Sequence, residues 1–397
     1  MSLTPFTKQQ LLPQEEKLEI ARHKSELFIG IPKETCFQER RICLTPDAVN
    51  SLTSHGHRVM VESGAGQSAS YSDKEYSDAG AEITADTKKV FSCPMLLKVE
   101  PPTIEEIEMI SPQTILISAI QLKTRKAPYF DALHKKKITA LAFEFIKDDD
   151  GSYPAVKSLS EIAGTASVLI AAELMINNQF GKGLLFGNIT GVPPTDVVIL
   201  GAGTVGEFAA KTAIGLGANV KVFDNSITKL RRLQQHLNQR IFTSTIQPKA
   251  LLKALRRCDV VIGAMRGKDR CPVVVSEGMV EHMKKGAVIV DVSIDTGGCF
   301  ETSEVTTHEK PTFVKHNVIH YCVPNIPSRY SKTASLSISN ILTPYLLQIA
   351  EDGGIESAIR VNNGLKHGVY FYHGILTNKA IGEWFGIPNS DLNLIVF

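Results

Sequence analysis

The sequence predicts an α/β protein with two Rossmann-like, doubly wound parallel-sheet domains that flank a cleft. Short apolar and β-branched runs recur along the chain with helix-like segments between them, as expected for strands buried on both faces of a parallel sheet. The runs form two sets, and a glycine-rich turn opens the second set. The length of 397 residues is sufficient for two domains of ordinary size.

The two sets of predicted strands lie on either side of a long apolar helical stretch. The predicted strands are 27–31, 58–62, 95–99, 114–119 and 138–144 in the first set, and 197–201, 220–224, 259–264, 287–292 and 318–323 in the second. Helices are predicted at 159–176 and 333–351, and the tail after the second helix is too short for a third domain. We therefore predict a discontinuous substrate domain formed by 1–153 and 332–397, and a dinucleotide-binding domain at 154–331, with the ligand in the cleft between them.

The composition is that of an ordinary globular protein and argues against several classes of partner. Apolar residues make up 43% and charged residues 21%, and the net charge of +2 gives no long-range field for nucleic acid or acidic membranes. The first 26 residues are too charged for a signal peptide, and no apolar stretch approaches the ~20 residues that cross a bilayer. The seven cysteines are scattered and never in CxxC spacing, which indicates reduced thiols. We expect a cytoplasmic protein without a metal site, a membrane segment or a nucleic-acid partner.

The glycine turn gives the clearest binding signal. The strand "VVILG" leads into Gly201-Ala202-Gly203-Thr204-Val205-Gly206, which opens a predicted helix. In such a turn Gly201 permits the tight bend, Gly203 lets the backbone approach a pyrophosphate, and Gly206 lets the helix pack on the strand, while the free N–H groups of the helix start, at Thr204 and Val205, face the phosphate charge. Asp224 ends the next strand, where a carboxylate accepts hydrogen bonds from a ribose and repels a 2′-phosphate. NAD is therefore expected rather than NADP.

Five further motifs stand in order along the chain. They are "IGIPKETCFQERRICLTPDAV" (29–49), "MLLKVEPP" (95–102), "LSEIAG" (159–164), "VDVSIDTGGCFE" (290–301) and "HYCVPNIPS" (320–328). Together they resemble the alanine dehydrogenase family, which is related to the nucleotide-binding subunit of proton-translocating nicotinamide nucleotide transhydrogenase. The resemblance extends over nearly the whole chain from about residue 28.

The resemblance implies substrate-side roles for four residues. Arg41 matches the arginine that binds the substrate carboxylate, and Lys98 matches the lysine beside the keto or amino group. Asp295 matches the aspartate near the reacting carbon and the nicotinamide, and Asn325 falls on a loop that reaches the cleft. The residue types suit this chemistry, because a guanidinium grips a carboxylate bidentately and an ammonium stabilises charge that develops on a carbonyl oxygen. The alternatives are a surface ion pair for Arg41, a solvated Lys98 and a turn cap for Asp295.

On the cofactor side, the resemblance adds Ser160 near the dinucleotide and pairs Lys229 with Asp224 at the ribose. One position departs from the family. Gln121 stands where the dehydrogenases carry a histidine as general acid/base, and an amide does not exchange a proton at neutral pH. Proton transfer is then expected to fall to Asp295 or Lys98, with a pKa moved toward neutrality by the closed cleft.

Two other residues have the right chemical type but a simpler explanation. His320 lies near the end of a predicted strand and is interpreted as a buried strand histidine whose hydrogen bonds are satisfied, with catalysis as the alternative. Cys299 has no neighbour in the sequence that would lower its pKa, so a structural thiol is favoured.

The leading functional hypothesis is NAD-dependent oxidative deamination of L-alanine to pyruvate and ammonium, or a closely related amino-acid dehydrogenase reaction. An alternative is a transhydrogenase-like NAD(H)-binding component that passes hydride to a partner, which needs no substrate acid/base and suits Gln121. Further alternatives are an NAD-binding homologue without turnover and an opine-type or saccharopine-like reductase. The resemblance also implies a homo-oligomer.

Overall fold

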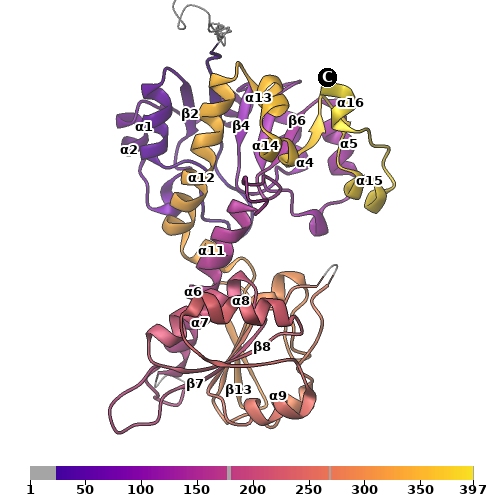
Figure 1. Ribbon diagram of the computed structural model, residues 1–397. Coiled ribbons are helices and arrows are strands. Elements are labelled where there is room, and N and C mark those ends of the chain that lie inside the picture. Colours follow the sequence, from indigo (N-terminus) through magenta and orange to yellow (C-terminus); the bar gives the residue numbers. More distant parts are fainter. Residues whose placement is uncertain (1–23, 177–179, 268–269, 397) are drawn as a thin grey trace, which may run out of the picture.

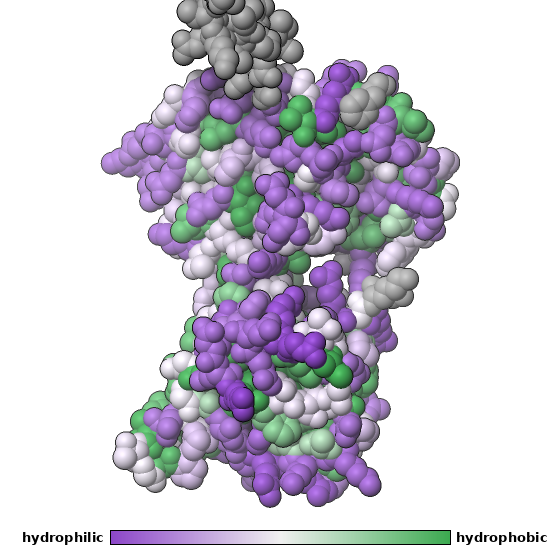
Figure 2. Space-filling model, in the orientation of Figure 1, coloured by the Kyte–Doolittle hydropathy of each residue, from purple (hydrophilic) through white to green (hydrophobic). Residues whose placement is uncertain are grey.

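The computed structural model describes residues 24–176, 180–267 and 270–396. The chain forms two α/β halves, one above the other in Figure 1, and each half is built on its own mostly parallel sheet. The predicted fold class is confirmed. In the space-filling view, the molecule narrows and is hollowed where the two halves meet (Figure 2).

The first half is built on an eight-stranded sheet. Its strands are β1 Phe28–Ile31, β2 Arg58–Glu62, β3 Glu82–Thr84, β4 Met95–Leu97, β5 Ile115–Ser118, β6 Thr139–Ala142, β14 Val369–Tyr372 and β15 Ile375–Leu376. The order across the sheet is β15-β14-β6-β5-β4-β1-β2-β3, with β14 antiparallel to both β6 and β15. The chain runs outward from β1 in one direction and from β4 in the other, so the loops after these two strands diverge and open a crevice at the switch point.

Helices cover both faces of this sheet. They are α1 Pro46–Ser54, α2 Asp73–Asp78, α3 Thr87–Phe91, α4 Ile104–Met109, α5 Ala127–Lys135, α12 Ser331–Glu351, α13 Ile355–Val361, α14 Asn363–Gly368, α15 Lys379–Phe385 and α16 Leu392–Val396, with short 3₁₀ turns η2 Gln67–Ala69 and η3 Leu122–Thr124. A capping box starts α4, in which the Thr103 hydroxyl accepts from the Glu106 N–H and the Glu106 carboxylate accepts from the Thr103 N–H. This box fixes Glu106 close to β4.

The second half has a seven-stranded sheet. Its strands are β7 Asp196–Leu200, β8 Asn219–Phe223, β9 Phe242–Ser244, β10 Val260–Gly263, β11 Val288–Asp291, β12 Thr312–Lys315 and β13 Val318–Tyr321. The order is β12-β13-β11-β10-β7-β8-β9, and only the edge strand β12 runs antiparallel to its neighbour. The switch point lies between β7 and β10. The helices of this half are α6 Pro154–Met175, α7 Thr204–Gly215, α8 Ile227–Leu237, α9 Pro248–Leu255, α10 Glu277–Val280 and α11 Ile326–Arg329, with η4 Val292–Thr296 after β11.

The long helices α6 and α12 connect the two halves (Figure 1). A Cβ at Gly164 of α6 would lie 2.4 Å from the Val205 carbonyl oxygen of α7, so this close approach requires glycine. By length and apolar composition, α6 is the one helix in the described part of the chain that meets the requirements for a membrane span, although the sequence analysis expected no such stretch. In the structure, α6 packs against α7 and α12 as a core helix.

All ten predicted strand runs form strands, and both predicted helices form. Five further strands were not predicted from the sequence and are short or lie near sheet edges, namely β3, β9, β12, β14 and β15. The tail after α12 supplies β14, which pairs with β6 of the first sheet. The domain boundaries at 153/154 and 331/332 stay a prediction.

Candidate functional site

The turn after β7 forms an open cradle of backbone. Gly201 has a φ of +110°, and a Cβ there would lie 2.3 Å from the carbonyl oxygen of Ala264. A Cβ at Gly206 would lie 1.9 Å from the Gly201 carbonyl oxygen, so α7 reaches the turn only because this residue is glycine. Gly203 caps α7 without a side-chain hydrogen bond and has open space beside it. The first N–H groups of α7 are therefore left for an anionic ligand.

Asp224 lies beside this cradle at the end of β8 and is buried. Its Oδ2 accepts from the Ala202 N–H at 2.8 Å, and its Oδ1 accepts from the Ser226 N–H at 2.7 Å. These two bonds orient the carboxylate and leave lone pairs for a ribose. Lys229 lies in the first turn of α8, where its N–H donates to the Ser226 hydroxyl at 3.3 Å.

The remaining predicted cofactor residues lie around the same turn. Thr204 and Val205 form the first turn of α7. Ser160 lies on α6, four residues before Gly164, so both share the face of α6 that packs against α7. The cradle, the helix start and Asp224 fit the pyrophosphate and adenosine ribose of a dinucleotide.

The opposing site of the first half forms at the carboxyl ends of β1, β4 and β5. Arg41 lies in the loop after β1, Lys98 follows β4 directly, and Gln121 follows β5. Because these strands are neighbours in the sheet and parallel, their terminal residues meet at the crevice of the switch point.

Arg41 is held by a buried carboxylate. Its Nε donates to Glu39 Oε1 at 2.7 Å, and its Nη2 donates to Glu39 Oε2 at 2.5 Å. The same Nη2 lies 3.5 Å from Glu100 Oε1. Although burial opposes the effect, the Arg41 guanidinium lowers the pKa of Glu39 to about 2. Arg41 is only 7% exposed, so it is not a surface ion-pair partner.

Lys98 is also buried among carboxylates. Its Nζ lies 3.2 Å from Glu34 Oε2 and 3.2 Å from Glu106 Oε1. Burial alone would lower the pKa of Lys98, but the charges of Glu34 and Glu106 outweigh it and raise the pKa. The shift is opposite to the one that a proton carrier at neutral pH needs. This direction does not favour Lys98 as the proton carrier, and its catalytic role stays a prediction.

Gln121 contacts a third acid of this cluster. Its Nε2 donates to Glu100 Oε2 at 2.5 Å, and its backbone N–H donates to Glu144 Oε1 at 3.1 Å. Gln121 has a φ of +47°, in the left-handed region, where the Glu144 bond helps to hold it. Burial of Glu100, followed by the negative charge of Glu39, raises the pKa of Glu100 to about 8. The carboxyl group with this raised pKa thus contacts Gln121, the residue at the position where the sequence resemblance places a histidine.

Two hydrogen bonds of Asn325 link this cluster to the second half. Asn325, after β13, donates from its Nδ2 to Glu39 Oε2 at 3.0 Å and from its backbone N–H to Asp295 Oδ1 at 3.0 Å. The Asp295 side chain is exposed in η4, and desolvation by the surrounding protein raises its pKa. Arg41 is near enough for its charge to oppose this rise. Arg41, Asn325 and Asp295 are therefore brought together through Glu39.

The structure accounts for His320 and Cys299 without catalysis. The Nε2 of His320 pairs with the Thr302 hydroxyl at 2.9 Å and its Nδ1 with the Val318 carbonyl at 3.0 Å, while burial lowers the pKa of His320 to about 4. Cys299 is buried in the core, and burial raises the pKa of its thiol well above the usual value. All seven cysteines are unpaired. Within 24–176, 180–267 and 270–396, no group of three or more His, Cys, Asp and Glu side chains is arranged to hold a metal ion.

Four acids that surround the two cations were not among the predicted site residues. These are Glu34, Glu39, Glu100 and Glu106. A signal was present, because a lysine or arginine that is predicted to be buried needs a carboxylate partner, and three of these acids lie in or beside the quoted motifs. Sequence alone did not show which acid meets which cation.

Comparisons with known proteins identify close relatives. The family model described as alanine dehydrogenase/PNT, N-terminal domain, matches residues 30–163, and the model for the C-terminal domain of the same family matches residues 167–379. The chain is 38% identical to the alanine dehydrogenase of Mycobacterium tuberculosis (strain ATCC 25618 / H37Rv), over 91% of this chain and 98% of the relative. It is 37% identical to alanine dehydrogenase 2 of Staphylococcus aureus (strain USA300), over 90% and 96% of the two chains.

Solved structures agree with these relatives. An L-alanine dehydrogenase structure superposes with a TM-score of 0.85 at 34% identity, over 91% of this chain and 99% of that one. A transhydrogenase from Sinorhizobium meliloti superposes with a TM-score of 0.75 at 24% identity, over 89% and 99% of the two chains, and shares the fold. The resemblance seen in the sequence motifs is confirmed.

Because of Asp224, we expect the chain to bind NADH more tightly than NADPH. Its buried carboxylate would meet a 2′-phosphate with like charge, so NADH should bind more than about tenfold tighter in fluorescence titrations. Asp224→Asn should narrow this ratio, whereas Asp131→Asn, an exposed acid on α5, should leave it unchanged. Equal affinities of the unaltered chain for both cofactors would contradict the ribose assignment.

Proposed function

The chain belongs to the alanine dehydrogenase/PNT family, and on that basis we propose that it is an NAD-dependent amino-acid dehydrogenase. In the proposed reaction, L-alanine, NAD⁺ and water give pyruvate, ammonium, NADH and a proton, reversibly. The observation that carries this proposal is the set of hydrogen bonds around Glu39 and Asn325. Through these bonds, Arg41 of the first half lies near Asp295 and Asn325 of the second. A substrate-anchoring cation and the end of a dinucleotide-binding sheet thereby face one space.

Arg41 binds the substrate carboxylate in this proposal. Glu39 engages Nε and Nη2, which fixes the plane of the guanidinium and leaves the donors of Nη1 to face the substrate. Lys98 remains charged between Glu34 and Glu106, with one of its three N–H donors left to stabilise negative charge on the substrate oxygen. These residues orient the substrate and do not exchange its proton.

The glycine turn, Ser160, Asp224 and Lys229 hold the dinucleotide, which supplies the hydride acceptor when it is bound. Asp295 and Asn325 lie at the carboxyl ends of β11 and β13, on the side of the sheet where the nicotinamide would lie. In this proposal Asp295 lies beside the reacting carbon, and desolvation by the surrounding protein raises its pKa.

We assign the reaction proton to Glu100. Its Oε2 accepts from Gln121 Nε2, and its Oε1 lies 3.5 Å from Arg41 Nη2, so it is next to the proposed substrate carboxylate site. In the oxidative direction the ionised carboxylate accepts the proton that the substrate ammonium gives up as hydride leaves the α-carbon, and in the reductive direction the carboxylic acid returns this proton to the nitrogen. Gln121 orients Glu100 and cannot itself titrate.

A transhydrogenase-like component remains the second candidate, because Gln121 replaces the family histidine. That function requires no proton carrier for an amino acid. NADH formation by the purified chain with L-alanine and NAD⁺ distinguishes the two. Turnover without any partner supports the dehydrogenase, whereas NADH binding with no turnover for a panel of L-amino acids supports the partner-dependent function.

We also propose that the chain forms a homo-oligomer in a reducing, cytoplasmic compartment, which suits its seven unpaired cysteines. The loop at 180–195 projects from the second half (Figure 1) and carries large apolar side chains. Leu185 is 72% exposed, Val192 57% and Ile189 53%, a patch that is costly to leave in water. Light scattering should give a multiple of the 43.4 kDa chain mass, and a monomer mass would contradict the proposal.

Removing Arg41 should abolish turnover and spare the cofactor site. Arg41→Ala deletes the substrate anchor and leaves Glu39 buried without its partner, a loss of roughly 2–5 kcal/mol. Steady-state rates with alanine should fall below detection, while NADH titration should give nearly unchanged affinity. Because Arg41→Ala also strains the fold, Arg41→Lys provides a second variant that keeps the charge but not the bidentate geometry, and it should chiefly raise KM.

The matched control for Arg41 is Arg58→Ala. Arg58 also pairs with a glutamate, Glu82, but its side chain is 51% exposed and lies at the start of β2. Wild-type kinetics in both Arg41 variants would show that Arg41 does not touch the substrate.

Glu100→Gln should remove the proton carrier and keep its shape. In alanine oxidation the carboxylate must be ionised, so the wild-type kcat should rise as pH increases through about 8, the pKa of Glu100. The variant should lose about 10²–10⁴-fold in kcat together with this pH dependence. Adding Gln121→His to Glu100→Gln should restore part of the rate, with a pH profile in the imidazole range.

Two controls accompany this prediction. Glu105→Gln changes an acid on the exposed side of α4 and should leave the profile intact. Unfolding gives a readout independent of activity. The folded-state pKa of Glu100 lies above the unfolded value, so its stabilising contribution is complete below about pH 4.3 and is lost as pH rises through about 8. Wild type should therefore lose stability relative to Glu100→Gln over this window. An unchanged kcat profile in Glu100→Gln would instead assign the proton to Asp295.

A further inference from the structure

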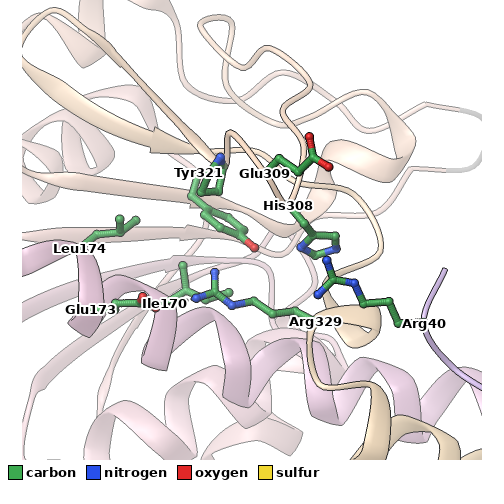
Figure 3. A pocket seen from close by; sticks show the side chains of 9 residues that line it. Arg40, Ile170, Glu173, Leu174, His308, Glu309, Tyr321 and Arg329 are labelled. Carbon is green, nitrogen blue, oxygen red and sulfur yellow. Dashed lines mark hydrogen bonds and ion pairs between the residues drawn. The ribbon is translucent and has the colours of Figure 1, made fainter. Parts of the chain in front are cut away.

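A second pocket lies at the junction of the two halves, apart from the proposed substrate site. It has a volume of about 380 Å³ and is lined by side chains from both halves (Figure 3). Arg40 comes from the loop after β1, His308 from the segment before β12, Tyr321 from the end of β13, and Arg329 from α11. None of these four residues has a part in the proposed dehydrogenase chemistry.

Two polar groups of the pocket have no hydrogen-bond partner. The Tyr321 side chain is 1% exposed, and its buried hydroxyl lies beside the Arg329 guanidinium without hydrogen-bond geometry. The buried Nε2 of His308 also lacks a partner. Buried polar atoms are paired in most folded proteins, and one left unpaired costs about as much as a lost hydrogen bond. Figure 3 shows the Tyr321 hydroxyl and the His308 ring directed into the same space.

The Arg40 guanidinium favours a single negative charge in the pocket. Arg329 is already paired, because its Nη2 donates to Glu173 Oε2 at 2.7 Å. Arg40 directs its guanidinium toward His308, whereas the carboxylate of Glu309, which also lines the pocket, points away from the Arg40 guanidinium (Figure 3). Burial, followed by the positive charges of Arg40 and Arg329, lowers the pKa of His308. An anion placed between Arg40 and His308 would offset these effects and favour the protonated ring, in which both nitrogens donate.

One wall of the pocket is apolar. Ile170 and Leu174 are one turn apart on α6, and Pro311 faces the same space from the segment before β12. We propose that the pocket binds a small organic monocarboxylate, whose oxygens accept hydrogen bonds from Arg40, His308 and Tyr321 and whose hydrocarbon part lies on the apolar wall. Inorganic phosphate shares the oxyanion chemistry but has no apolar part and carries up to two charges.

Binding at this place would couple to the relative position of the halves. The Arg40 N–H donates to the Ser328 hydroxyl at 3.0 Å, and the Ser328 hydroxyl donates to the Gln38 carbonyl at 2.6 Å. A carboxylate held by Arg40 of the first half and by His308 and Tyr321 of the second adds to this junction. It therefore stabilises the arrangement in which the site is assembled, by its differential affinity for that arrangement.

The test uses isobutyrate as the probe, with isobutyramide as its uncharged isostere and inorganic phosphate as the comparator. Isothermal titration of the full chain should show saturable binding of isobutyrate, at least about tenfold weaker binding of phosphate and none of the amide. Tyr321→Phe and Arg40→Gln should each weaken isobutyrate binding about tenfold. Arg360→Gln, an exposed arginine on α13, should not change it.

Two further measurements separate loss of binding from unfolding and from binding at the proposed substrate site. Tyr321→Phe removes a hydroxyl without a hydrogen bond, so the Tm of the free protein should not fall and loss of binding cannot be ascribed to unfolding. Isobutyrate binding should survive Arg41→Lys, which alters the proposed substrate site, and it is measured without turnover, so it does not depend on the proposed function. The proposal is overturned if binding disappears in Arg41→Lys but persists in Tyr321→Phe and Arg40→Gln, or if phosphate binds as tightly as isobutyrate.

Discussion

The buried pair of Glu39 and Arg41 is the interaction on which the rest of the site depends. Burying two charges is costly, and only good geometry with further hydrogen bonds compensates for it. Glu39 meets this condition, because its Oε1 also accepts from the backbone N–H groups of Arg40 and Arg41, and its Oε2 accepts from Asn325. The carboxylate is thereby saturated with donors, which agrees with its low pKa. The Glu39 side chain thus holds both the Arg41 guanidinium and the Asn325 loop of the opposite half.

Around this pair, carboxyl groups outnumber cations. Lys98 and Arg41 face four glutamates, and full ionisation of all four would leave uncompensated negative charge in the interior. Desolvation is the largest cause that raises the pKa values of Glu34 and Glu100, so protonation balances the cluster. In the proposed mechanism, this surplus of acids holds a proton beside the substrate. Gln121 is compatible with that mechanism, because the acid that it contacts, Glu100, takes the role of the titrating group.

The sequence predicted what depends on local patterns. The ten buried strand runs, the glycine turn and the two long helices are short-range signals, and they form where predicted. β14 was not predicted, because its pairing with β6 joins segments more than 200 residues apart. The Gln121–Glu100 contact was not predicted for a similar reason. It depends on the register of β4 against β5, because this register determines which residues of the two following loops meet. The direction of the Lys98 pKa shift could not be predicted from the sequence. It follows from two acids, Glu34 and Glu106, which the fold brings close to the Lys98 Nζ.

The junction also sets a limit on how the site operates. The segment 38–40 joins 325–328 through three hydrogen bonds, namely Asn325 to Glu39, Arg40 to Ser328 and Ser328 to Gln38. Each contributes about 0.5–1.5 kcal/mol net, so together they oppose separation of the halves by only a few kcal/mol. Binding of a charged substrate and a dinucleotide exchanges free energies of at least this size, and such ligands are able to shift the halves between arrangements. Separation of the halves would part Asn325 from Glu39 and move Asp295 away from Arg41. Assembly of the proposed site and exclusion of water from it would then depend on the same carboxylate, that of Glu39.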